Sequence, residues 1–152
     1  MSFLQNLYDK AFAIASEAHK GQKDRGGAPY ILHPINVANR CKSDRAKVVA
    51  LLHDVVEDSN VTLKDLDDAG FPKDMVIAVA FLTKTSYESY EKYITSISNN
   101  ELATEVKIAD LQENMDITRL KKLTDKDFQR LQKYHEAYKY LTNQKQYMYE
   151  ED

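Results

Sequence analysis

Four ionisable side chains stand within one apolar stretch, residues 51–58, which reads LLHDVVED. On a helix His53 and Glu57 share one face, as do Asp54 and Asp58, because residues four apart are neighbours. A helix as apolar as this must be largely buried. Burying ionised carboxylates costs several kcal/mol of folding stability unless a partner compensates for it. A divalent cation is one such partner, since it binds imidazole nitrogen and carboxylate oxygen together. The alternative is a hydrogen-bonded His53–Asp54 core pair followed by a solvated helix end.

Two other positions have residue types that suit such a site. His33 follows two apolar residues and precedes Pro34, which disfavours helical backbone at His33 and suits the first position of a helix. A histidine held at a loop-to-helix junction is suited to point into a site. Asp110 is flanked by small and apolar residues in a predicted helix, and Asn114 lies one turn further along the same face.

The segment 20–30, KGQKDRGGAPY, is rich in turn-forming residues and is predicted to be a loop. Its basic residues Lys23 and Arg25 are suited to bind phosphate. The alternative is an ordinary solvated surface loop, in which these charges serve solubility alone.

The elements that position these residues are predicted to be helices, from apolar residues with a 3.6-residue period and from capping signals. The predicted ranges are 3–19, 34–41, 44–57, 62–69, 72–82, 87–97, 101–115 and 124–142. No convincing strand pattern occurs. The sequence therefore predicts an all-α fold, a bundle of about eight helices packed around the helix 44–57.

Size and composition indicate one globular domain, 1–152, with a motif-bearing core at about 3–142 and a polar C-terminal tail, 143–152, that frays. The net charge of −3 argues against a nucleic-acid partner. The single Cys41 excludes an internal disulfide, and no apolar run is as long as a membrane span. A cytoplasmic protein is expected.

Four segments carry a resemblance to a known family: AHKGQ at 18–22, GAPYILHP at 27–34, LLHDVVED at 51–58 and VKIAD at 106–110. In their order and in their residues these segments resemble the HD-domain metal-dependent phosphohydrolases. The resemblance is strongest to the hydrolase domain of the RelA/SpoT-type alarmone enzymes and to the small alarmone hydrolases. The resemblance implies an all-α HD-domain fold, a bound Mn²⁺ ion and a nucleotide substrate. The implied reaction removes the 3′-pyrophosphate of (p)ppGpp, giving GDP or GTP and pyrophosphate.

Carried over residue by residue, the resemblance implies a role for each matching position. The implied metal ligands are His33, His53, Asp54 and Asp110. Glu57 and Asp58 match the acidic pair that orients and deprotonates the attacking water. The expected substrate-binding residues are Lys23, Arg25, Tyr30, Lys107 and Asn114. Fe²⁺, Mg²⁺ and Zn²⁺ remain alternatives to Mn²⁺.

Two positions depart from the family pattern. The family carries an arginine nine residues before the first metal histidine, where it helps to hold the guanine base, and this chain has Asp24 there. A second family arginine, in a segment after the metal aspartate, is replaced by Asp116. Acidic residues beside a polyphosphate pocket should lower affinity for a highly charged substrate, so base recognition either shifts to Lys23 and Arg25 or differs. The nearby cations are Arg119, Lys121 and Lys122, for which a solvated helix end is the alternative.

Two further functions stay open at this stage. One keeps the metal site but hydrolyses another nucleotide or a simple phosphate ester, as other HD proteins do; the Glu57–Asp58 pair favours the alarmone branch instead. The other is a catalytically silent nucleotide-binding module, against which the presence of all six metal and acidic residues argues. The chain ends too early to hold a pyrophosphokinase domain, so no synthetase activity is expected.

Overall fold

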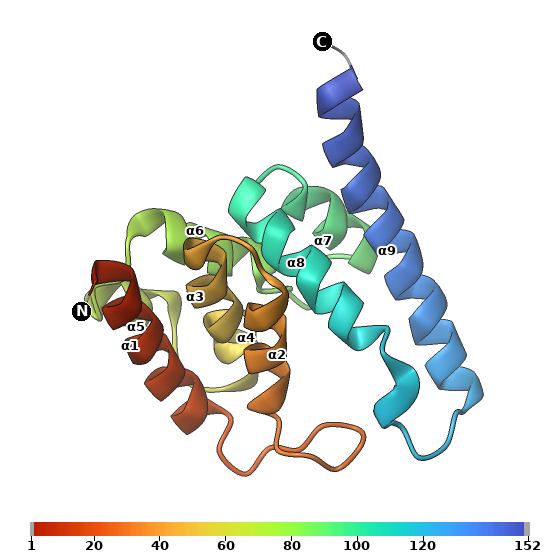
Figure 1. Ribbon diagram of the computed structural model, residues 1–152, viewed down its shortest axis with the longest axis horizontal. Coiled ribbons are helices and arrows are strands. Elements are labelled where there is room, and N and C mark those ends of the chain that lie inside the picture. Colours follow the sequence, from red (N-terminus) through yellow and green to blue (C-terminus); the bar gives the residue numbers. More distant parts are fainter. Residues whose placement is uncertain (1, 151–152) are drawn as a thin grey trace.

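The computed structural model describes residues 2–150, with side chains up to Asn143. The elements are α1 (Phe3–Ala18), α2 (Leu32–Arg40), α3 (Asp44–Leu52), α4 (Val55–Asp58), α5 (Leu63–Asp68), α6 (Lys73–Leu82), α7 (Tyr90–Ile97), α8 (Glu101–Asn114), the short 3-10 helix η1 (Ile117–Arg119) and α9 (Asp125–Glu150) (Figure 1). Over these residues no strand forms apart from an isolated bridge between Lys23 and Pro29. The predicted all-α fold is confirmed.

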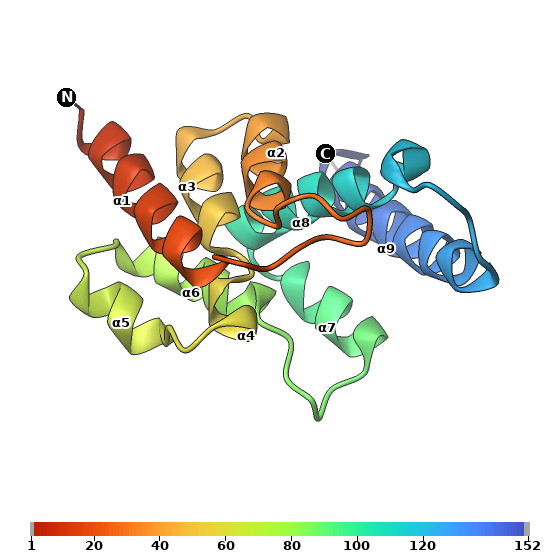
Figure 2. The same ribbon diagram turned by 90° about the horizontal axis from the view of Figure 1, so that it is seen from below.

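Helix α3 lies at the centre of the bundle, in contact with α1, α2, α6 and α8 (Figures 1 and 2). The residues 48–52 are all buried, at most 1% exposed, so the helix has no solvent face along this stretch. This is the position expected of a segment that is apolar around most of its circumference. None of the helices described is long and apolar enough to span a lipid bilayer.

The prediction of one continuous helix over 44–57 is wrong at its most important point. Helix α3 ends at Leu52, and Asp54 has φ −105° and ψ −3°, in the sparsely populated bridge region between helix and extended chain. The His53 ring explains the break, because its Nδ1 lies 2.5 Å from the Ala50 carbonyl oxygen and competes for a helical hydrogen-bond acceptor. The two residues thus lie at a corner rather than within a helix.

Helix α2 begins earlier than its proline suggests. His33 lies within the first turn, where its N–H donates to the Tyr30 carbonyl at 2.9 Å, so the expected non-helical backbone at His33 is wrong. Pro34 is the third residue of the helix, where a backbone N–H has no partner inside the helix in any case. The proline therefore removes no hydrogen bond.

Most of the predicted helix starts are confirmed. Ser2, Ser43 and Asn100 accept capping hydrogen bonds from the first turns of α1, α3 and α8, and Thr62 with Asp65 forms a capping box. Helix α7 begins at Tyr90, three residues later than predicted, with Ser89 as its cap. Helix α9 continues to Glu150, past the start of the predicted tail; residues 151–152 and the side chains of 144–150 lie outside the described part.

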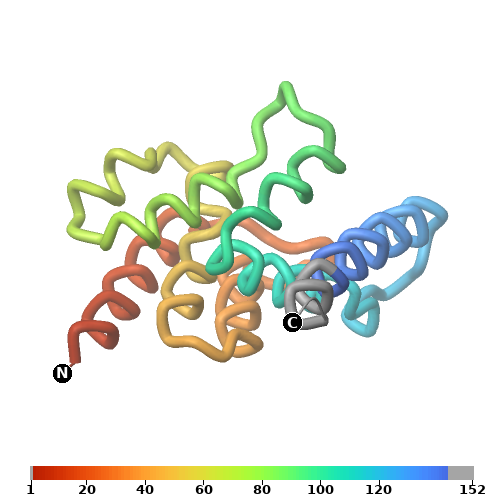
Figure 3. Tube along the Cα trace, turned by 90° about the horizontal axis from the view of Figure 1, so that it is seen from above, coloured from red at the N-terminus to blue at the C-terminus, as the bar shows by residue number. Residues whose placement is uncertain are grey.

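The last helix closes one side of the molecule. Helix α9 packs on α8 and α7 (Figure 3). The loop between α1 and α2 extends toward the segment that joins α8 to α9 (Figure 2). Two segments near opposite ends of the sequence thereby meet beside α8, next to the residues considered below.

Candidate metal centre and adjoining cavities

The two predicted imidazole ligands lie together in the interior. His33, from α2, and His53, from the α3–α4 corner, are both buried, with ring centroids 5.5 Å apart. The His53 Nδ1–H donates to the Ala50 carbonyl, which leaves Nε2 as the ring nitrogen that a proton or a cation can occupy. That Nε2 is buried and has no hydrogen-bond partner, which is costly for a polar atom unless something else occupies its lone pair.

The two predicted carboxylate ligands face these nitrogens. An Asp110 oxygen lies 2.8 Å from His33 Nε2 and 3.4 Å from His53 Nε2. An Asp54 oxygen lies 3.1 Å from His53 Nε2 and 3.9 Å from His33 Nε2. The donor atoms of His33, His53 and Asp54 all lie within 4.8 Å of one another. The structure thus brings together all four residues that the sequence resemblance marked as ligands.

The electrostatics of this group suit a cation. Burial opposes ionisation of Asp54, but the His53 imidazole more than offsets it and lowers the pKa of Asp54 to about 2. Burial likewise opposes charge on His53, yet Asp54 and Asp110 hold the pKa of its ring well above the ordinary value. Two imidazoles and two carboxylates with an unpartnered ring nitrogen therefore fit a divalent cation.

Asp110 is held in place by two residues of its own helix. Lys107 Nζ lies 2.8 Å from one carboxylate oxygen, and the Asn114 side-chain amide donates to the other at 3.1 Å. Burial opposes ionisation of Asp110, but Lys107 and the imidazoles keep its pKa well below the usual range. Lys107 itself is buried, with its ammonium 5.1 Å from the centre of the Tyr93 ring. In this position Lys107 and Asn114 orient a proposed ligand.

Tyr30 holds the second carboxylate. Its hydroxyl donates to Asp54, and burial together with the Asp54 charge raises the pKa of Tyr30, so the phenol stays a donor. Its ring lies 5.5 Å, centroid to centroid, from that of His33. Tyr30 thus links the loop before α2 to the corner between α3 and α4.

Of the predicted acidic pair on α4, Glu57 lines a cavity beside Asp54, whereas Asp58 lines a separate cavity against α1. Glu57 accepts a hydrogen bond from the backbone N–H of Lys84. Burial and the charges of Asp54 and Asp58 raise the pKa of Glu57, although the Lys84 hydrogen bond acts to lower it. The pKa of Asp58 is raised by burial and by Asp54. A carboxylate with a raised pKa is a better proton acceptor than an ordinary one.

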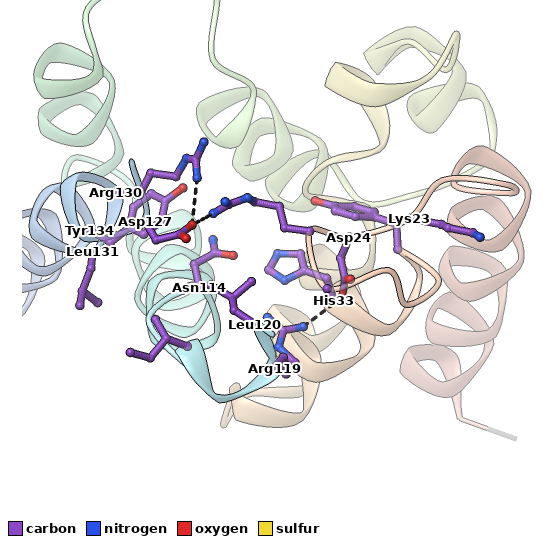
Figure 4. A pocket seen from close by; sticks show the side chains of 14 residues that line it. Lys23, Asp24, His33, Asn114, Arg119, Leu120, Asp127, Arg130, Leu131 and Tyr134 are labelled. Carbon is purple, nitrogen blue, oxygen red and sulfur yellow. Dashed lines mark hydrogen bonds and ion pairs between the residues drawn. The ribbon is translucent and has the colours of Figure 1, made fainter. Parts of the chain in front are cut away.

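Two cavities adjoin the metal group, and both are lined by Tyr30, His33, Asn114 and Tyr134. The first, of about 220 Å³, is lined by the charged residues Lys23, Asp24, Arg25, Arg119, Asp127 and Arg130 (Figure 4). The second, of about 390 Å³, is lined by Lys84, Lys107, Lys133, Tyr90 and Tyr93 beside Asp54 and Glu57. The two cavities are therefore neighbours: the second lies against the proposed ligands His33, Asp54 and Asp110, and the first against His33 alone.

Several lining residues were missed in the sequence. Lys84 lies in the loop after α6, Tyr90 begins α7, and Arg130 and Lys133 lie on α9. Only Lys133 has a sequence signal for this position, because it stands beside Tyr134 on the apolar seam of the last helix. Lys23 and Arg25 both line the first cavity, and the Arg25 guanidinium is engaged there with the buried Asp127.

Asp127 ties the wall of the first cavity together. It accepts hydrogen bonds from the backbone N–H and the hydroxyl of Thr124, at 2.8 and 2.9 Å, and forms ion pairs with Arg25 and Arg130. The Thr124 backbone and the Arg25 guanidinium lower the pKa of Asp127 from 3.8 to about 2. The ionised form therefore stabilises the folded state above pH 3.8, and this stabilisation is lost as the pH falls through about 2.

Asp127→Asn is accordingly expected to lower the melting temperature at pH 7, since the amide keeps one acceptor oxygen but no charge. The difference from the wild type should close between pH 4 and pH 2, within the window set by the pKa shift. Thermal unfolding followed by circular dichroism across this pH range measures it. Asp67→Asn, on the exposed face of α5, is the control and should match the wild type throughout. A difference that stays constant down to pH 2 contradicts the prediction.

Two buried imidazoles and two carboxylates inside an all-α bundle are the arrangement of the HD class that the sequence resembles. A guanosine-3′,5′-bis(diphosphate) 3′-pyrophosphohydrolase of Vibrio cholerae serotype O1 is 33% identical to this chain over 121 residues, 70% of this chain and 17% of that protein. The bifunctional (p)ppGpp synthase/hydrolase SpoT of Escherichia coli K12 gives the same values. A probable GTP pyrophosphokinase of Mycobacterium leprae is 34% identical over 122 residues, 72% of this chain and 16% of that protein.

The chain thus spans about one sixth of the length of these curated relatives. A solved structure of a metazoan orthologue of SpoT, described as hydrolysing ppGpp, superposes with a TM-score of 0.74 at 20% identity, over 89% of this chain and 84% of that one. No family model matches the sequence. The chain is a relative of the RelA/SpoT-type alarmone enzymes, and the resemblance recognised in its sequence is confirmed.

Proposed function

We propose that this protein is a cytoplasmic, divalent-cation-dependent hydrolase that removes the 3′-pyrophosphate of ppGpp or pppGpp, with Mn²⁺ as its cation. The observation that carries the proposal is the buried, unpartnered Nε2 of His53, which faces two carboxylates and a second imidazole. The relatives named above supply the substrate class.

The proposed ligands are His33, His53, Asp54 and Asp110. When bound, a divalent cation polarises a phosphoryl oxygen and makes water more acidic. The chain's own contribution is orientation: Tyr30 fixes Asp54, and Lys107 with Asn114 fixes Asp110. Because these partners are buried or half-buried, the donor atoms are held in place before substrate arrives.

Glu57 and Asp58 are the proposed proton acceptors. As water adds to the phosphorus next to the 3′-oxygen, the bond between them breaks, GDP or GTP leaves with its 3′-oxygen protonated, and pyrophosphate is the second product. The raised pKa of Glu57 suits it to take the proton from the water, while the Lys84 N–H holds one of its oxygens.

The second cavity is the proposed place of the pyrophosphate. Three lysines, Lys84, Lys107 and Lys133, supply positive charge beside the metal group. The Tyr90 hydroxyl lines the same cavity, is buried and has no hydrogen-bond partner, so it is suited to donate to a phosphate oxygen. The Lys133 ammonium lies 4.5 Å from the centre of the Tyr90 ring, which places its charge at this wall.

Lys133→Gln is expected to raise KM for ppGpp by about tenfold with a smaller change in kcat, because it removes one charge–phosphate contact of roughly 1.5 kcal/mol. Steady-state kinetics at several salt concentrations measures the effect, which should shrink at high salt. Lys139→Gln, on an exposed part of α9, is the matched control. Equal KM values in the Lys133 and Lys139 variants would contradict this role for Lys133.

The proposed function is tested with purified protein, Mn²⁺ and a panel of ppGpp, pppGpp, NADPH and nucleoside monophosphates. Anion-exchange chromatography separates the nucleotides, and pyrophosphate and orthophosphate are assayed separately. Release of pyrophosphate and GDP from ppGpp is the expected result. Orthophosphate from a monophosphate, or no turnover of any compound with Mn²⁺ bound, would refute it.

A further inference from the structure

The first cavity contains a pair of opposite charges from two segments that are far apart in the sequence. Arg119 Nη1, from η1, lies 3.3 Å from an oxygen of Asp24, although 95 positions separate the two residues (Figure 4). Asp24 is therefore accompanied by a guanidinium that comes from the other wall of the cavity.

The pair is held in place by the loop itself. The other oxygen of Asp24 accepts the Ala28 N–H at 2.9 Å, which fixes the carboxylate. A Cβ at Gly26 would lie 3.1 Å from the Arg119 carbonyl oxygen, so a side chain there would push the two walls slightly apart. Asp24 is thus fixed and largely covered, whereas Arg119 reaches it from the exposed rim of the cavity.

Both members of the pair retain hydrogen-bonding capacity. A carboxylate offers about four lone-pair sites and a guanidinium five N–H donors, whereas the two groups share a single contact at 3.3 Å. Arg25, the other arginine of the loop, is instead paired with the buried Asp127, together with Arg130. Asp24 and Arg119 are therefore a pair of opposite charges with free donors and acceptors at this cavity, which the cations Lys23 and Arg130 also line.

A carboxylate beside a guanidinium matches one edge of guanine. Guanine presents O6 as an acceptor next to the N1–H and N2–H donors, so an arginine donates to O6 while an aspartate accepts from the two N–H groups. Adenine presents a donor at its N6 and an acceptor at N1, which opposes both groups of the pair. The apolar side chains that line the cavity offer contacts to the faces of a base: Ile117, Leu120, Leu131 and Tyr134.

We propose that Asp24 and Arg119 together determine the base specificity of this site by reading the Watson–Crick edge of guanine. This proposal rests on the proposed function, since it places a guanine nucleotide at this site. On this proposal Asp24 selects guanine over adenine, instead of merely lowering the affinity for a charged nucleotide.

The test compares binding of GDP, IDP and ADP by isothermal titration calorimetry, because GDP is a product of the proposed reaction and binds without turnover. Wild-type protein is expected to bind GDP about 10- to 100-fold more tightly than ADP, because hydrogen bonds to charged groups contribute a free energy of this size. IDP, which lacks the 2-amino group, should fall between them. Asp24→Asn, which keeps an oxygen for Ala28, should bring the GDP-to-ADP ratio to within about threefold.

Asp67→Asn is the control and should keep the wild-type ratio, and circular dichroism verifies that each variant is folded. Equal affinity of the wild type for GDP and ADP, or an unchanged ratio in folded Asp24→Asn, would overturn the pairing. Hydrolysis of ppGpp measured on the same samples separates the two proposals. Turnover without guanine preference refutes only the pair, and guanine preference without turnover refutes only the proposed reaction.

Discussion

Asp54→Ala is expected to abolish cation binding and, with it, hydrolysis. The substitution removes a carboxylate whose oxygen lies 3.1 Å from the unpartnered His53 nitrogen, and it also removes the acceptor of the Tyr30 hydroxyl. Asp54 lies with His53 at the corner between α3 and α4, where the backbone is already irregular. Manganese content after dialysis, measured by mass spectrometry, should fall from about one ion per chain, as the single site requires, to background. Hydrolysis of ppGpp should fall by several orders of magnitude.

The comparison variants separate loss of the ligand from loss of the fold. Asp54→Asn keeps an acceptor for Tyr30 and should retain the wild-type circular dichroism spectrum while still losing the metal. Asp67→Asn should bind metal normally. Equal manganese content in wild type and Asp54→Ala would refute the assignment of Asp54 as a ligand.

Glu57→Gln is expected to retain the cation but lose turnover. The amide oxygen still accepts the Lys84 N–H, so the loop after α6 keeps its place, whereas the member of the acidic pair that lines the second cavity can no longer accept a proton. Removing a general base typically lowers kcat by about 10²- to 10⁴-fold. In the wild type the acidic limb of the pH profile should lie above 4.5, because Glu57 must be ionised and its pKa is raised from that value. The variant should lose this limb.

Steady-state kinetics and metal analysis on the same samples test whether Glu57 acts in turnover without taking part in cation binding. Glu91→Gln, on the exposed side of α7, is the matched control and should behave as wild type. A Glu57→Gln variant with full kcat, or one that has lost its manganese, would contradict the role of Glu57 as proton acceptor.

The fold was predictable where local signals agree with packing. The capping residues Ser43, Thr62 and Asn100 marked helix starts correctly, and the apolar content of 44–52 placed that helix at the centre. The break at His53 was not predictable, because it depends on a side chain that takes a carbonyl from its own helix. The first turn of α2 was missed because a residue before proline only tends to avoid helical backbone. His33 adopts helical backbone in spite of Pro34, which is the third residue of the helix.

The site was predictable in its ligand types but not in its surroundings. The resemblance of four short segments indicated His33 and Asp110 as partners of His53, and the structure brings these residues together. Lys84 and Lys133 carry no such signal, since their presence at the second cavity depends on how a loop and α9 pack on α8. The contact between Asp24 and Arg119 could not be read from a sequence in which 95 positions separate them.

The long separations have a consequence for the order in which the protein acquires its parts. His33 and Asp110 are 77 residues apart, and contacts of this kind form late because the intervening chain must first be ordered. During synthesis a growing chain that stops before α8 holds three of the four proposed donors and lacks the residue that bridges both imidazoles. High-affinity manganese uptake should therefore coincide with the docking of α8, so that a ribosome-bound fragment ending at residue 100 remains metal-free.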